Sequence, residues 1–350
     1  MQSWKPDIFS AHADLKILVD FFHQATCALF EYAGKLNHDE EYQKALDYFH
    51  SMYSKLSKNP GAIYYPCTFE WHYTFKKILK TENPDLNCII NHLESIEQLK
   101  TDIQSCKRNR KKNLDVHNIP VCIDILRPGK FKQTIFNIKG GDTLRYLDRL
   151  SSQDKGNIIE ALKLIQSVWP EFYTEFLIYI RQINIHGSTG EKTCFSALYS
   201  QGLINIDIGY FKGGEPFKWA EYIVHEGAHV RLAASMIFQK YYTNGREVAY
   251  ETPLRKDKRP MYGLFHQIFV IVRLVEFYRR LKDAGYDVQE QLNHHMRDLE
   301  LGLGQLTEQA RLTPEGFLLV GSMIDYARNI IGLKCPEIRS LNESTEPLAA

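Results

Sequence analysis

The feature that most constrains this chain is an apolar stretch, residues 219–240, that carries two histidines four positions apart. It contains the run Val224-His225-Glu226-Gly227-Ala228-His229. Positions four apart lie on one face of an α-helix, so the imidazoles of His225 and His229 can bind one metal ion. Glu226 between them can hydrogen-bond a metal-bound water or orient another ligand. The stretch therefore predicts a helix that holds half of a metal site.

The residues around this motif favour burial of the helix. Apolar side chains recur on one side of the stretch at helical spacing: Trp219, Ala220, Ile223, Val224, Leu232 and Ile237. Such a stripe packs against a core. The H-E-x-x-H pattern also arises by chance on ordinary amphipathic helices, so a third ligand is needed before the motif carries weight.

The composition is that of a globular chain without a dominant charge. The 350 residues are 44% hydrophobic, which is enough for a substantial core in one large domain or two ordinary ones. With 43 basic and 42 acidic residues the formal charge is +1, so we expect neither nucleic acid nor a membrane as partner. The N-terminus lacks the order of a signal peptide, which predicts a cytoplasmic protein. The seven scattered cysteines predict reduced thiols.

Hydrophobic periodicity predicts a mainly α fold with a small β-sheet, of the α+β class. The metal site is expected between two core helices, with a gluzincin-like HExxH helix. Short strands are predicted at 121–126, 131–138, 195–199 and 203–208, a polar loop at 241–258, and a solvated basic run at 107–112. The predicted division is an N-terminal helical region at 1–117, an HExxH metal-binding catalytic domain at 118–340 and a tail at 341–350.

Several classes of third ligand can be compared with the sequence. The metzincin pattern is excluded, because Leu232 and Ser235 stand where it needs glycine and histidine. A gluzincin-type zinc peptidase would use a glutamate, and the candidates are Glu247, Glu251 and Glu276. The other candidate is His266, in a helix predicted at 261–281, which would complete a three-histidine centre. The residue pattern alone leaves both options open.

The order of segments after the motif is more specific. Tyr241-Tyr242 follows it, and then the run Thr252-Pro253-Leu254-Arg255-Lys256-Asp257-Lys258-Arg259-Pro260-Met261-Tyr262-Gly263-Leu264-Phe265-His266. This arrangement resembles the H-E-x-x-H peptide β-hydroxylase family, which is associated with ribosomal peptide modification. The resemblance covers about residues 142–281. Leu254 replaces the family's usual tryptophan and Lys258 a common proline, so the substrate side of the pocket is expected to differ.

The resemblance implies an Fe(II)- and 2-oxoglutarate-dependent oxygenase, a dioxygenase that hydroxylates a Cβ position of a ribosomally made peptide, with or without a leader segment. It implies that His225, His229 and His266 bind Fe(II) and that Arg255 or Arg259 holds the distal carboxylate of 2-oxoglutarate. The forked guanidinium group suits a carboxylate. Glu226 would be catalytic or would orient a ligand. Ser196 and Asn205 are candidates for substrate contacts.

The sequence is also compatible with two other functions. A zinc-dependent HExxH metallopeptidase would use Glu226 as general base. A non-catalytic peptide-recognition protein would carry a relic metal site. The arginines also have a plain interpretation, as surface partners of Asp257 or Glu251.

Overall fold

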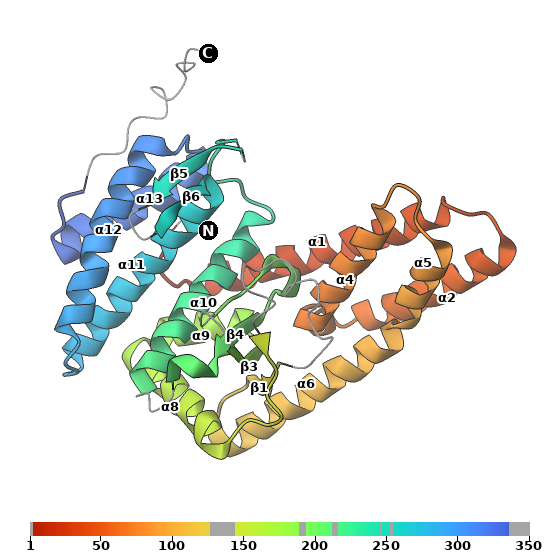
Figure 1. Cartoon of the computed structure of the whole chain (residues 1–350), viewed down its shortest axis with the longest axis horizontal. Helices are drawn as coiled ribbons and strands as arrows, with labels where there is room; N and C mark the ends of the chain where they lie inside the picture. Colours follow the sequence, from red (N-terminus) through yellow and green to blue (C-terminus); the bar gives the residue numbers. More distant parts are fainter. Residues whose placement is uncertain are drawn as a thin grey trace, which may run out of the picture. The chain divides into compact units, whose positions relative to one another are not determined.

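A computed structural model describes residues 3–126, 144–188, 194–211, 216–245, 247–252 and 255–335. These residues are mainly helical with a small sheet, which confirms the predicted α+β class at that level (Figure 1). The chain forms two compact units. We call residues 1–14, 161–176 and 220–350 the histidine unit, and residues 15–160 and 177–219 the sheet unit. The predicted functional boundary at residue 117 stays a prediction, and the predicted tail lies outside the described residues.

The first part of the chain is helical, and most of it belongs to the sheet unit. Its helices are α1 (Ile8–Gly34), α2 (Glu40–Ser57), α3 (Pro60–Ile63), α4 (Pro66–Leu79), α5 (Leu86–Glu94) and α6 (Ile96–His117). Asp39 fixes the start of α2, because its side chain accepts hydrogen bonds from the backbone N–H groups of Glu41 and Tyr42. An aromatic core that includes Phe30, Trp71 and Phe75 holds the helices together.

A small sheet follows, made of β1 (Cys122–Ile125), β2 (Leu144–Arg145), β3 (Gln182–Ser188) and β4 (Leu203–Asp207). β3 pairs with all three others, in parallel with β1 and β4 and antiparallel with β2. The register of β3 and β4 sets isoleucines on one face and buried polar side chains on the other: Asn184 and His186 with Asn205 and Asp207. Parallel strands covered on both faces are expected to be buried in this way.

The strand predictions are confirmed in part. β1 and β4 lie at the predicted 121–126 and 203–208, whereas 131–138 falls outside the described residues. The prediction at 195–199 is wrong. Phe195 forms an isolated bridge with Asn205, and the chain then enters a 3-10 helix, η2 (Leu198–Ser200). An apolar segment of five residues is too short for its pattern to distinguish a strand from a single helical turn.

The remaining elements lie wholly or mostly in the histidine unit, apart from the first of them, whose residues 152–160 belong to the sheet unit and whose residues 161–168 belong to the histidine unit. They are α8 (Ser152–Val168), α9 (Pro170–Tyr179), α10 (Pro216–Met236), β5 (Ala249–Thr252), β6 (Arg255–Pro260), α11 (Met261–Asp283), α12 (Gln289–Gln309), α13 (Pro314–Tyr326) and the π-helix η4 (Ala327–Ile331). A short 3-10 helix, η3 (Ile208–Phe211), precedes α10. The predicted loop at 241–258 is wrong in its second half, where β5 and β6 form an antiparallel hairpin. Backbone hydrogen bonds hold this hairpin together. Its many charged side chains are typical of a loop, so the sequence pattern does not indicate strands here.

The core of the histidine unit is α11, which packs against α12. Its length and composition would allow it to cross a membrane, and among the described residues it is the one such helix. Its apolar window is 83% buried, as in the core helix of a soluble protein. The cytoplasmic location itself stays a prediction.

A glycine at the start of α13 tests how closely this helix packs against the backbone at Tyr241. A Cβ on Gly316 would lie 1.8 Å from the backbone oxygen of Tyr241, whereas one on Gly304 of α12 would meet nothing within 4 Å. We expect Gly316→Ala to lower the free energy of unfolding by at least about 2 kcal/mol, because backbone must move. Gly304→Ala should raise it by about 0.5–1 kcal/mol through helix propensity. Urea unfolding of both variants measures this, and equal effects would contradict the described packing.

Candidate metal centre

Three histidine rings lie next to one another in the histidine unit. His225 and His229 come from α10, and His266 comes from the second turn of α11. The Nε2 atoms of His225 and His229 are 3.2 Å apart, and the Nδ1 atoms of His229 and His266 are 3.1 Å apart. Ligand nitrogens that share one divalent ion at bonds of about 2.1 Å are separated by about 3 Å. The structure thus brings together the three side chains that the sequence analysis selected.

The three rings form a row with His229 in the middle. His229 turns Nε2 to one neighbour and Nδ1 to the other, so its two short contacts use opposite ring nitrogens. In keeping with this row, no group of three His, Cys, Asp or Glu side chains among the described residues is arranged to hold an ion as it stands. Closure around one ion needs rotation of an imidazole about its Cβ–Cγ bond, which is a soft torsion.

His266 is the most buried of the three rings. Its side chain is 5% exposed, whereas His225 and His229 are half-buried. Burial lowers the pKa of His266 to about 3, so its imidazole is neutral at physiological pH, the form that binds metals. Its Nε2 atom is buried without a hydrogen-bond partner among the described residues. A buried polar atom of this kind is costly unless something binds it.

The motif's glycine allows α10 to approach α9. A Cβ on Gly227 would lie 3.0 Å from Phe176 and 3.3 Å from Phe172. Most of the predicted apolar stripe is buried on the same helix, with Trp219, Ala220 and Leu232 each at 0% exposure. Its last member, Ile237, lies past the end of α10 and is only half-buried, so the predicted end at residue 240 is wrong. The histidines are therefore carried by a helix that is fixed on most of its surface.

A buried ionic network joins the two histidine-bearing helices. Glu175 of α9 accepts hydrogen bonds from Arg231 of α10, at 3.3 Å, and from Arg273 of α11, at 2.5 Å. All three side chains are at most 2% exposed. Arg231 is two residues past His229, and Arg273 is two helical turns past His266. Because one carboxylate binds both arginines, it sets the register of α10 against α11.

The N-terminal segment completes this network. Asp14 accepts a hydrogen bond from Arg231 at 2.7 Å, and the backbone oxygen of Trp4 accepts one from Arg273 at 3.1 Å. Trp4 is itself fixed to α13, because its indole N–H donates to the backbone oxygen of Ser322. Residues at the start of the chain thus support the helices that carry the histidines.

The sequence analysis did not single out these charged residues. Arg273 interrupts an otherwise apolar run, Phe269-Val270-Ile271-Val272-Arg273-Leu274-Val275. A lone arginine inside such a run indicates a buried ion pair, since a buried charge needs a partner. The pattern could have identified Arg273, but not Glu175 as its partner.

A second carboxylate stands one turn before His225. Glu221 accepts a hydrogen bond from the Tyr278 hydroxyl at 2.7 Å and lies 3.7 Å from Nε2 of His295. Burial alone would raise the pKa of Glu221, but the nearby His295 and the hydrogen bond from Tyr278 outweigh it and the pKa is lowered. Glu221 is therefore an ionised group on the helix that carries His225.

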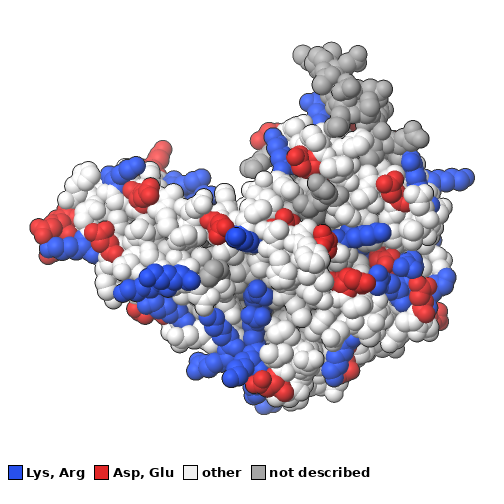
Figure 2. Space-filling model, turned by 180° about the vertical axis from the view of Figure 1, so that it is seen from behind, with Lys and Arg blue, Asp and Glu red and all other residues white. Residues whose placement is uncertain are grey.

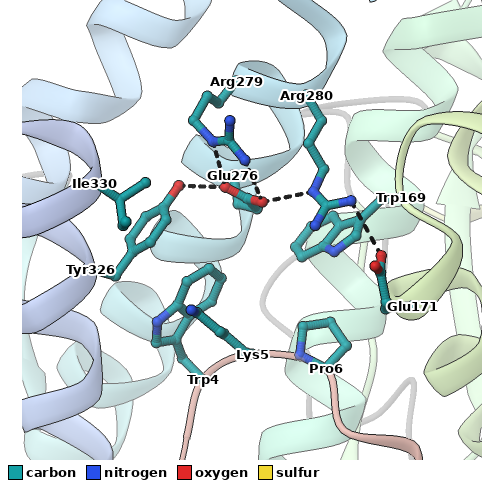
Figure 3. Close-up of a pocket in the computed structure, with 10 residues that line it drawn as sticks. All are labelled: Trp4, Lys5, Pro6, Trp169, Glu171, Glu276, Arg279, Arg280, Tyr326 and Ile330. Carbon is teal, nitrogen blue, oxygen red and sulfur yellow. Dashed lines mark hydrogen bonds and ion pairs between the residues drawn. The ribbon is translucent and has the colours of Figure 1, made fainter. Parts of the chain in front are cut away.

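The glutamates considered as gluzincin-type ligands lie elsewhere. Glu276 accepts hydrogen bonds from Tyr326, Arg279 and Arg280 at 2.6–2.8 Å (Figure 3). It stands ten residues past His266, about 15 Å along α11. Glu247 and Glu251 are exposed, and Glu251 pairs with Lys258 at 3.4 Å.

A cavity of about 320 Å³ lies at this end of α11. Figure 3 shows the residues that line it. The indoles of Trp4 and Trp169 and the ring of Tyr326 form its apolar walls, and Lys5 lies at its edge. Its arginines are paired with Glu276 and Glu171. It is distinct from the row of histidines.

The other predicted residues are placed as follows. Arg255 begins β6, but its side chain lies outside the described residues. Arg259 is half-buried on the same strand, opposite Tyr250. Glu226 is 3% exposed. Asn205 is fully buried in β4 and Ser196 is half-buried, both in the sheet unit.

Comparison with models of known protein families finds no match, and comparison with curated proteins finds none either.

The network predicts that substitution of Glu175 destabilises the protein much more than substitution of Glu171. We expect Glu175→Gln to lower the free energy of unfolding by about 3–5 kcal/mol, because two buried guanidinium groups lose their shared anion. Glu171→Gln removes the partly exposed partner of Arg280 and should cost less than about 1 kcal/mol. Urea unfolding measures both. If the two variants are equally stable, Glu175 does not hold the helices.

Proposed function

We propose that this protein is an Fe(II)- and 2-oxoglutarate-dependent oxygenase that hydroxylates a Cβ position of a peptide. The observation that carries the proposal is the contact between His229 and His266, at 3.1 Å, from two separate buried helices. A third imidazole at this place, with a buried Nε2 that lacks a described partner, suits a three-histidine iron centre. Glu276, the candidate on the same helix for a zinc peptidase's third ligand, is bound to two arginines and a tyrosine instead.

The donor set fits a divalent metal in residue type. His225, His229 and His266 would hold it. Three neutral ligands leave the charge of the metal uncompensated, which favours a dianionic cosubstrate. When bound, iron with 2-oxoglutarate would supply oxidation by O2.

The protein's own residues have separate tasks in this proposal. Glu175 fixes α10 against α11, so that little ordering remains to be done when a metal binds. Arg259, or Arg255 on the same strand, would bind the distal carboxylate of 2-oxoglutarate through its forked N–H donors. Glu226 would orient a ligand or water, because a general base is needed for hydrolysis and not for hydroxylation.

Metal binding tests the role of His266. Titration of Fe(II) in the absence of oxygen should give one bound ion, and His266→Ala should weaken its affinity at least about tenfold. The control is His294→Ala, which alters an exposed histidine of α12. If the affinity is unchanged in His266→Ala, His266 is not a ligand of the metal. No metal binding at all would favour the non-catalytic recognition protein.

Cosubstrate kinetics test the arginines. With peptide and O2 supplied, succinate should form, and Arg259→Ala should raise KM for 2-oxoglutarate about tenfold or more without loss of bound iron. Arg259→Lys should recover only part of this, since lysine lacks the fork. Lys258→Ala is the exposed control, and Arg255→Ala is measured in parallel. If KM is unchanged in both arginine variants, neither binds 2-oxoglutarate. Zinc-dependent peptide cleavage that is lost in Glu226→Gln would establish the peptidase instead.

A further inference from the structure

The strongest surface feature outside the proposed centre is one side of α6. Lys107, Arg108, Lys111 and Lys112 are all exposed there. In Figure 2, Lys and Arg side chains gather in the part of the surface where α6 lies in Figure 1. Among the described residues, none of the four forms an ion pair. Lys107 lies 5.8 Å from the ring centre of Tyr65, but no carboxylate in the described part of the chain neutralises these four charges.

The cations are arranged in two adjacent ridges, and each ridge ends on an exposed apolar side chain. Lys107, Lys111 and Leu114 follow at spacings of four and three, and Arg108, Lys112 and Val116 follow at spacings of four. Leu114 is 44% exposed and Val116 is 64% exposed. We call these six residues the α6 basic face. Asp115 is the one acidic residue between them.

Positive charge also accumulates beneath this face. Arg110 donates hydrogen bonds to the backbone oxygen of Pro120 and the hydroxyl of Tyr65. Arg181 donates to the backbone oxygen of Leu177 and lies 5.4 Å from the ring centre of Tyr64. Neither guanidinium has a carboxylate partner among the described residues. Burial is the main cause that lowers the pKa of Arg181, and repulsion from Arg110 lowers it further.

Helix stability does not account for the pattern. Cations complement the helix dipole only in the last turn, and the last turn of α6 contains His117 and no lysine. Like charges at a spacing of four destabilise a helix, as Lys107 with Lys111 and Arg108 with Lys112 must do here. The arrangement costs stability, which is expected of a surface that binds an anion.

We propose that the α6 basic face binds an acidic peptide segment that also carries apolar side chains. The exposed Leu114 and Val116 favour a peptide over a nucleic acid, because phosphates leave apolar side chains without a partner. The rings beneath the face, Tyr64 and Tyr65, are at most 3% exposed and cannot stack on bases. This surface lies wholly in the sheet unit, and the inference does not depend on the metal centre.

Fluorescence anisotropy with the full chain tests the proposal. The probes are a labelled peptide of repeated Glu-Glu-Leu triplets, the same peptide with Gln for Glu, an oligoglutamate, and an oligouridylate of equal length. We expect the Glu-Glu-Leu peptide to bind most tightly and its affinity to fall as salt is raised. Lys111→Glu/Lys112→Glu should weaken its binding about tenfold or more. The control Lys55→Glu/Lys58→Glu makes the same charge change on exposed residues at the end of α2 and should leave binding unchanged.

A second variant separates the apolar part of the surface from its charge. Leu114→Ser/Val116→Ser should weaken binding of the Glu-Glu-Leu peptide about threefold or more and leave oligoglutamate binding unchanged. The proposal is overturned if no acidic probe binds, if the control weakens binding as much as Lys111→Glu/Lys112→Glu, or if oligouridylate binds as tightly as the peptide. All substituted residues are exposed, so urea unfolding should show each variant folded.

Discussion

The proposed centre depends on the buried carboxylate of Glu175, which binds Arg231 and Arg273 at once. Two guanidinium groups and one carboxylate are costly to bury, and such groups are tolerated only when their geometry is well satisfied. Here the result is a fixed register between α10 and α11. That register is what allows His229 and His266, which are 37 positions apart in the chain, to meet.

Local patterns in the sequence are sufficient to predict the two helices and their histidines. The spacing of His225 and His229 and the apolar stripe of α10 are properties of a single helix, as is the periodicity of α11. The network that joins them is not local. Glu175, Arg231 and Arg273 belong to three helices, and nothing in one segment specifies a partner in another. The same applies to β3, which forms the middle of the sheet through pairings with three strands.

Charged segments were the least predictable from sequence, for two different physical reasons. The β5–β6 hairpin is held by backbone hydrogen bonds, so its Lys and Arg content indicated a loop where there are strands. The sequence predicts that the basic run on α6 is solvated, and most of its cations are exposed. Only the structure shows that its cations lack described counterions and lie in register with Leu114 and Val116. The composition gives the number of charged residues, but it does not show which of them are paired with an opposite charge in the folded protein.

X-ray absorption at the iron edge of the protein loaded with Fe(II) in the absence of oxygen tests the central claim most directly. Three imidazoles give nitrogen scatterers at about 2.1 Å, with the outer-shell scattering of three rings. We expect that signal, and His266→Ala should remove one ring from it. A first shell with two imidazoles and a carboxylate, unchanged in His266→Ala, would contradict the account.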